Sequence, residues 1–312
     1  MSRNTEMFAL RQPPPETIEL AGRPYRLVRV FKHDFFAATC LYEIQGSPHA
    51  SDSGDSTRRH RATGTPSAGP RVSVSGTDDL IPRIVVKFGR TQRFCGLPTA
   101  WYATSVRAHE ETIYSMLAGI PGVPRWAGRV GRHGYAIEYI EGKSLDHFPT
   151  APPGFFDGLR RILDAVHARG ICYCDAHKRS NILVGPGGRP YLIDYQIAFR
   201  RRDDLPWPLR PILRAIVAYF QRADIYHLYK HKRRLCPQEL TPEEEVLSRR
   251  RGRLHTLHRK LTDPWRVLRR WFLRTQYQKG RLVSPTAQLE DTYQPETATW
   301  RKDPGTHEGH GP

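Results

Sequence analysis

The chain has 312 residues and a formal net charge of +18 at pH 7, from 49 Lys and Arg against 31 Asp and Glu. This length suggests one bilobal domain or two small ones, with ample apolar material for a core. The charge favours polyanionic partners, namely phosphates, nucleic acid or an anionic membrane surface, although an arginine-rich genome would produce the same excess.

Neither a membrane span nor a secretion signal is visible in the sequence. No run reaches the roughly 18 apolar residues that a spanning helix needs. The first residues, Met-Ser-Arg-Asn-Thr-Glu, contain no apolar signal-peptide core. The five cysteines include no pair that suggests a metal site, which indicates a reducing compartment. We therefore expect a cytoplasmic protein that could contact the inner face of an anionic membrane peripherally.

The first part of the chain predicts strands around a polar insertion. Residues 1–17 are polar, contain a run of prolines and are interpreted as a disordered tail. The runs 25–31 and 38–44 predict a hairpin. Residues 46–80 are rich in Ser, Gly, Asp and Arg without apolar periodicity, so we expect a disordered insertion between two strands.

A strand and a helix follow this insertion. Residues 84–88, Ile-Val-Val-Lys-Phe, predict a strand with Lys87 near its end. A helix is predicted over about 100–118, and Gly119 ends it. A lysine at a strand end is usually only solvated, so its meaning depends on the elements around it.

One face of the predicted helix carries an acidic residue among apolar ones. Glu110, Ile113 and Leu117 share a face because they are spaced i, i+3 and i+7. Glu110 therefore points toward the sheet and can pair with Lys87, since an unpaired buried carboxylate is costly. Glu111 lies roughly 100° away around the helix and is the second choice.

A second hairpin and a second helix come next. Residues 125–131 and 134–139 predict the hairpin, and 155–169 predict an amphipathic helix that Gly170 ends. The apolar stripe of this helix consists of Leu159, Ile162, Leu163 and Val166.

The stretch 170–196 organises the chain. Its run Asn181-Ile-Leu-Val, a Gly-Pro-Gly-Gly turn and the run Tyr-Leu-Ile predict two short strands in a hairpin. This hairpin brings Asn181 and Asp194 together, with Asp175 one loop away. Such oxygen ligands suit Mg²⁺, which proteins usually hold with one or two carboxylates plus substrate phosphates. Loop Asp and Asn residues also commonly serve turns and caps, and that alternative stays open.

The remainder is helical and basic, with 22 Lys and Arg against 8 Asp and Glu over residues 200–281. Helices are predicted over 208–222, from Thr241 with a capping box to Glu244, and from Asp263. Solvated arginines on packed helices, contact with an anionic membrane or lipid-linked glycan, and nucleic-acid binding all explain the charge. Nucleic acid is the least favoured partner, because no nucleic-acid-binding module is recognised.

The order of strand pair, strand with Lys, helix with Glu, strands, helix and hairpin resembles the protein-kinase-like superfamily. The closest resemblance is to bacterial lipopolysaccharide-core (Kdo/heptose) kinases and RIO-type kinases. The chain departs from the usual pattern at several points. Tyr173-Cys174 stands for His-Arg, Asp194-Tyr195-Gln196 stands for Asp-Phe-Gly, and the spacing from Asp175 to the asparagine is one residue longer. No Ala-Pro-Glu segment follows.

The resemblance implies an α+β fold of the bilobal protein-kinase-like type. A small antiparallel-sheet N-lobe would span 18–137, including the insertion, and a mainly helical C-lobe would span 142–282. The kinase-like domain would therefore cover 18–282, followed by a disordered tail over 283–312.

The resemblance also implies an ATP- and Mg²⁺-dependent phosphotransferase. Asp175 would accept the proton of the acceptor hydroxyl. Lys87, positioned by Glu110, would hold the α- and β-phosphates. Asn181 and Asp194 would hold Mg²⁺.

Further contacts follow from the same resemblance. The segment with Glu138 and Ile140 would meet adenine at the hinge, and Lys178 could contact the γ-phosphate, although a solvated surface Lys is an equal alternative. The loop over 32–37 should cover the phosphates, yet it lacks glycine, so Lys32 or His33 would have to help. An Asp such as Asp224 would brace the catalytic loop, unless it caps a helix.

The acceptor remains a choice between a protein Ser or Thr and a sugar of a lipid-linked glycan. Fold analogy alone does not decide between them. The alternative to an enzyme is a catalytically weak or inactive pseudokinase that acts as a nucleotide-responsive binding module.

Overall fold

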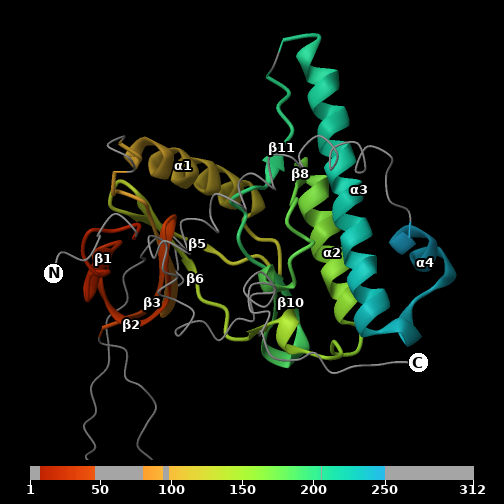
Figure 1. Cartoon of the computed structure of the whole chain (residues 1–312), viewed down its shortest axis with the longest axis horizontal. Coiled ribbons are helices and arrows are strands. Elements are labelled where there is room, and N and C mark those ends of the chain that lie inside the picture. Colours follow the sequence, from red (N-terminus) through yellow and green to blue (C-terminus); the bar gives the residue numbers. More distant parts are fainter. Residues whose placement is uncertain (1–7, 46–79, 94–97, 205, 250–312) are drawn as a thin grey trace, which may run out of the picture.

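The computed structural model describes residues 8–45, 80–93, 98–204 and 206–249 (Figure 1). The predicted 46–80 insertion therefore lies outside the described residues except for Leu80. The helix predicted from Asp263 and the tail over 283–312 also lie outside them. Within the described part, no helix is long and apolar enough to cross a membrane.

A six-stranded antiparallel sheet in the order β1-β2-β3-β4-β6-β5 forms one part of the fold. Its strands are β1 (Thr17–Leu20), β2 (Arg23–His33), β3 (Ala37–Ile44), β4 (Arg83–Gly89), β5 (Trp126–Val130) and β6 (Gly134–Glu138). Both predicted hairpins are confirmed, since β2 pairs with β3 and β5 pairs with β6. β2 is longer than expected and carries two register shifts against β3.

Alternation along β4 separates two environments. Ile84 and Val86 are completely buried with residues of β2, β3 and β6 in one apolar cluster. Because side chains alternate along a strand, Val85 and Lys87 face the other side, where Val85 packs on the main core. Helix α1 (Ala100–Leu117) covers that side of the sheet (Figure 1).

The predicted inward face of α1 is confirmed. Glu110, Ile113 and Leu117 are each at most 1% exposed. The helix ends before Gly119, whose φ of +82° is a left-handed conformation that glycine adopts without strain. An acidic side chain is thus carried into the interior by the same stripe that packs α1 on the sheet.

The second part of the fold is built from helices α2 (Phe155–Ala168), α3 (Leu209–Leu235) and α4 (Pro242–Arg249). Short strands lie beside them in two small sheets, β10-β9-β7 and β11-β8. These strands are β7 (Lys143–Ser144), β8 (Ile171–Cys172), β9 (Ile182–Val184), β10 (Pro190–Leu192) and β11 (Phe199–Arg200). The protein is therefore α+β, with an antiparallel sheet and helices.

One helix boundary was wrong and one cap was right. The helix predicted over 208–222 continues as α3 to Leu235, because its buried positions recur at Val217, Asp224 and Leu228 along one side. At α4 the capping box forms in both directions. The Glu244 N–H donates to Thr241 Oγ1 at 3.3 Å, and the Thr241 N–H donates to Glu244 Oε2 at 2.9 Å.

The disordered tail predicted over 1–17 is wrong from residue 8 onward. Ala9 is fully buried, its N–H donates to the Asp34 carbonyl at 2.8 Å, and its carbonyl accepts the Thr91 N–H at 2.9 Å. Residues 8–10 therefore fill a gap beside the β2–β3 turn. Residues 1–7 lie outside the described part.

Candidate functional site

The predicted hairpin of residues 182–192 forms as β9 and β10, with Ile182, Val184 and Leu192 buried. Gly187 and Gly188 supply the turn with φ of +67° and +72°. This hairpin positions polar residues at its open end. Asn181 precedes β9 in a 3₁₀ turn, and Asp194 follows β10.

The Lys87 cluster consists of Lys87, Glu110, Tyr135 and Asp194. Lys87 Nζ lies 2.9 Å from Asp194 Oδ1 and 3.9 Å from Glu110 Oε1. The Tyr135 hydroxyl donates to Glu110 Oε2, and Tyr135 stands opposite Lys87 in the β4–β6 register. The pairing of Lys87 with Glu110, inferred from helix periodicity, is thus present as a contact, and Asp194 joins it.

Burial and charge oppose each other in this cluster. Burial would lower the pKa of Lys87, but the carboxylates of Asp194 and Glu110 raise it above its usual value, so the amine stays protonated. Burial raises the pKa of Glu110 to about 7 in spite of Lys87. For Asp194 burial acts upward, yet Lys87 holds the pKa of this carboxyl below its ordinary value. Lys87 is therefore committed more strongly to Asp194 than to Glu110.

The Asp175 cluster consists of Asp175, His177, Lys178 and Asn181. Asp175 is 3% exposed, and its Oδ2 accepts hydrogen bonds from Asn181 Nδ2 at 2.7 Å and from Lys178 Nζ at 2.9 Å. Its Oδ1 is buried and has no hydrogen-bond partner in the described part of the chain. His177 Nδ1 lies 3.3 Å from Oδ1 without hydrogen-bond geometry. One oxygen is thus fixed and the other is left without a donor.

The two clusters lie next to each other across the β9–β10 hairpin. The Ile193 N–H donates to the Asn181 carbonyl at 3.1 Å, which joins the residue before Asp194 to the Asp175 cluster. The positive charge of Lys178 helps to lower the pKa of Asp194. Asp194 itself has a φ of +63°, a left-handed conformation that costs a non-glycine residue energy. This unfavourable conformation occurs at the residue whose carboxylate contacts Lys87.

Asp224 braces the loop that carries Asp175, and it is not a helix cap. It lies in the middle of α3, is 1% exposed, and accepts the Tyr173 N–H on Oδ2 at 2.8 Å and the Cys174 N–H on Oδ1 at 2.9 Å. His167 Nε2 is 3.0 Å from Oδ2. Burial raises the pKa of Asp224 against the lowering effect of these contacts. Cys174, with φ of +66°, is held in a strained conformation directly before Asp175.

Other predicted residues have different partners. Glu138 accepts a hydrogen bond from Nε of Arg125, the residue before β5, at 3.2 Å. Ile140 follows β6 in the half-buried linker between the two parts of the fold. Glu111, the second choice, pairs with Arg107 and Arg129, each at 2.8 Å, away from Lys87.

The glycine-free turn between β2 and β3 is stabilised from within. Asp34 Oδ1 accepts the N–H groups of Phe36 and Ala37 at 2.9 and 3.0 Å. Lys32 Nζ lies 2.8 Å from Asp34 Oδ2, and His33 Nε2 accepts the Leu10 N–H at 3.3 Å. The two side chains suggested as a phosphate clamp therefore already have partners, Lys32 within the turn and His33 at Leu10.

The sequence analysis missed residues that complete the site. Tyr135 was missed because β6 had not been assigned as the neighbour of β4. His231 was missed because α3 was expected to end earlier. His231 is buried, and its Nε2 lies 3.0 Å from the Ala176 carbonyl, directly after Asp175.

Whether the site suits a metal ion depends on the oxygen atoms that the two clusters provide as ligands. No group of three or more His, Cys, Asp or Glu side chains suited to a metal occurs in the described residues. The pair predicted for Mg²⁺ is of another kind, one amide and one carboxylate. Asn181 uses Nδ2 toward Asp175, so its amide oxygen, with a long 3.5 Å contact from Ser180, can serve as a ligand. Amide and carboxylate oxygens are of the chemical kind that a hard cation binds together with phosphate and water.

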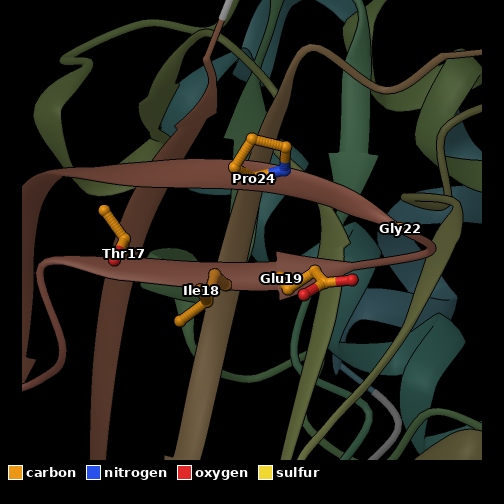
Figure 2. Close-up of a pocket in the computed structure, with 5 residues that line it drawn as sticks. All are labelled: Thr17, Ile18, Glu19, Gly22 and Pro24. Carbon is orange, nitrogen blue, oxygen red and sulfur yellow. The ribbon is translucent and has the colours of Figure 1, made fainter.

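The hollow in Figure 2 lies elsewhere. It is lined by Thr17, Ile18, Glu19, Gly22 and Pro24 on the β1–β2 hairpin, and these side chains do not converge on one point. It contributes nothing to either cluster.

Comparison with known proteins gives no family for this chain: no protein-family model matches it, and no curated protein matches it.

Proposed function

We propose that the protein is an ATP- and Mg²⁺-dependent phosphotransferase that moves the γ-phosphate of ATP to a hydroxyl acceptor. The observation that carries this proposal is the Asp175 carboxylate, buried and fixed through Oδ2 but without a hydrogen-bond donor at Oδ1. A buried acceptor that lacks a donor costs roughly 1–3 kcal/mol, which a substrate hydroxyl would recover on binding.

Asp175 would accept the hydrogen bond and then the proton of the attacking hydroxyl at Oδ1. Asn181 and Lys178 hold Oδ2, so the carboxylate keeps one orientation toward the acceptor. Phosphoryl transfer depends mainly on such positioning and on charge stabilisation. The half-exposed Lys178 also lies where it can attract a phosphate.

Lys87 would bind the α- and β-phosphates. Its contacts with Asp194 and Glu110 keep the amine charged in a partly buried position, which is the state needed to donate to phosphate oxygens. Asn181 and Asp194 would hold Mg²⁺, which when bound neutralises phosphate charge. The hinge role of Glu138 and Ile140 toward adenine belongs to the same proposal.

The bilobal, kinase-like arrangement is part of this proposal. It is supported by an antiparallel sheet whose β4 Lys pairs with a Glu of α1, followed by a mainly helical part with the Asp175 loop. A cytoplasmic location is supported by free thiols at all cysteines in the described part. The acceptor is a protein Ser or Thr or a sugar of a lipid-linked glycan, since either supplies the required hydroxyl.

The test is transfer of labelled γ-phosphate from Mg-ATP into a lysate of the source organism, separated into protein and lipid-glycan fractions. The matched variants are Asp175→Asn and, as a control, Asp164→Asn, an exposed aspartate of α2. We expect label in one fraction that disappears only with Asp175→Asn. Equal labelling by both variants, or no label with any protein, would overturn the proposed enzymatic activity.

The β2–β3 turn favours a second candidate, a nucleotide-responsive binding module without turnover. Its Lys32 is paired with Asp34, and glycine, which lets backbone approach phosphate, is absent from the turn. ATP binding that survives in Asp175→Asn, together with an absence of transfer by the unaltered protein, would select this module.

A further inference from the structure

The first two turns of α3 expose an apolar stripe. Leu209, Ile212 and Ile216 share one side of the helix and are 50%, 55% and 40% exposed. Trp207, just before the helix, is 83% exposed. We call these four residues the α3 tip. The first buried residue of the helix is Val217, and Figure 1 shows this end of α3 projecting beyond the rest of the described fold.

Arginines surround the α3 tip. This part of the sequence contains four arginines and only two aspartates, namely Arg201, Arg202, Arg210, Arg214, Asp203 and Asp204. Asp203 is shared between Arg201 at 3.0 Å and Arg214 at 2.8 Å, so the pairs leave a local positive excess. All three charges are about half exposed, and such exposed pairs constrain their partners weakly.

An occupant must match both the aliphatic side chains and the positive charge. Residues 250–281 carry apolar side chains such as Trp265 and Leu268, but also 11 Lys and Arg against one Asp. Like charge therefore disfavours this segment as the cover for the α3 tip. Nucleic acid fits the charge but gives large aliphatic side chains little to contact. A bilayer with anionic headgroups satisfies both requirements, because a Trp and aliphatic residues enter the interface while arginines meet phosphate.

We propose that the α3 tip docks the protein on an anionic membrane surface, with Trp207, Leu209, Ile212 and Ile216 entering the headgroup region. The interaction is peripheral, since the apolar area covers only two turns of helix. It needs neither ATP nor Asp175, so it goes beyond the proposed activity.

The experiment is co-sedimentation of the full-length protein with vesicles of phosphatidylcholine alone or with about 30 mol% phosphatidylglycerol. The negative charge of phosphatidylglycerol attracts arginines near the membrane surface. The test variant is Trp207→Ser with Ile212→Ser. Its matched control is Trp101→Ser with Val246→Ser, two residues that are 68% and 56% exposed on α1 and α4. Circular dichroism verifies that all proteins are folded.

We expect binding to the anionic vesicles alone, weakened at least about tenfold in the test variant by loss of buried apolar groups, and unchanged in the control. Asp175→Asn should bind like the unaltered protein, so failure of docking and failure of catalysis are separable. The proposal is overturned if the unaltered protein does not bind anionic vesicles, or if the test and control variants bind them equally. It is also overturned if the protein binds nucleic acid through Trp207 and does not bind the vesicles.

Discussion

Asp175 lies on a loop that Asp224 of α3 braces; both aspartates are buried, but their hydrogen bonds differ. Both oxygens of Asp224 accept hydrogen bonds from backbone N–H groups, and His167 adds a third contact. Asp175 accepts hydrogen bonds only on Oδ2, while its buried Oδ1 lies 3.3 Å from His177 Nδ1 and has no hydrogen-bond partner among the described residues. The two carboxylates are equally hidden from water but differ in what remains for another molecule.

Under the proposed function, this difference would separate a structural carboxylate, Asp224, from a reactive one, Asp175. Satisfied buried acceptors stabilise a fold, whereas an unsatisfied one is a cost that a ligand can remove. Burial alone would therefore have assigned both residues the same function. The hydrogen-bond partners distinguish them, and the comparison can be tested from both sides.

The largest effect is expected at Asp175. Asp175→Asn keeps an oxygen for Asn181 and Lys178 but cannot take a proton, so phosphate transfer should fall by roughly 10²–10⁴-fold. The urea-unfolding midpoint should hardly move. Single-turnover transfer and equilibrium unfolding are the two measurements. A strong loss of stability with this variant would place Asp175 in the same class as Asp224.

Asp224→Ala should reverse this pattern. The variant leaves the N–H groups of Tyr173 and Cys174 buried without an acceptor, and we expect the free energy of unfolding to fall by about 3 kcal/mol. Urea denaturation measures it. Activity should fall as well, because the loop before Asp175 loses its support. If Asp224→Ala were as stable as the unaltered protein, the brace would not exist in solution.

His231 lies on the same face of α3 as Asp224, about two turns further along. Its protonation should make the stability of the protein depend on pH. Burial lowers the pKa of His231 to about 4, helped by Arg179, Lys230 and Arg234. The unfolded chain takes up this proton near pH 6.5, so stability falls as pH drops from there toward 4, in total by roughly 3 kcal/mol.

The measurement is unfolding free energy against pH for the unaltered protein and His231→Gln, which can still donate to the Ala176 carbonyl. The raised pKa of Glu110 acts in the opposite direction, lowering stability as pH rises from about 4.5 to 7. This contribution is common to both proteins and cancels in their difference. Parallel pH curves would mean that His231 is not held neutral by burial.

The smallest effect is expected at an exposed aspartate. Asp164 pairs with Arg160 at 2.8 Å on α2, and its side chain is 52% exposed. Asp164→Asn should change stability by less than about 0.5 kcal/mol and leave transfer unchanged. Thermal unfolding and the transfer assay measure both quantities. A larger effect would show that the charge of an exposed carboxylate affects stability or transfer as much as a buried one does.

Local pattern predicted much of this molecule. The face of α1 with Glu110, the β9–β10 hairpin and the capping box at Thr241 each depend on residues close in sequence, so periodicity and turn chemistry sufficed. Strand neighbours and long helices depend on distant packing. Tyr135 beside Lys87, residues 8–10 in their gap and the continuation of α3 to Leu235 were therefore not predicted.

The brace on the Asp175 loop has a consequence for the order of synthesis. Asp224 follows Tyr173 by 51 residues. A nascent chain can therefore have its sheet, α1, α2 and the whole β9–β10 hairpin available while the loop amides still lack their acceptor. Only when the middle of α3 has left the ribosome can the loop adopt its final geometry. A chain that ends before this point would carry every predicted site residue and still hold Asp175 on an unsupported loop.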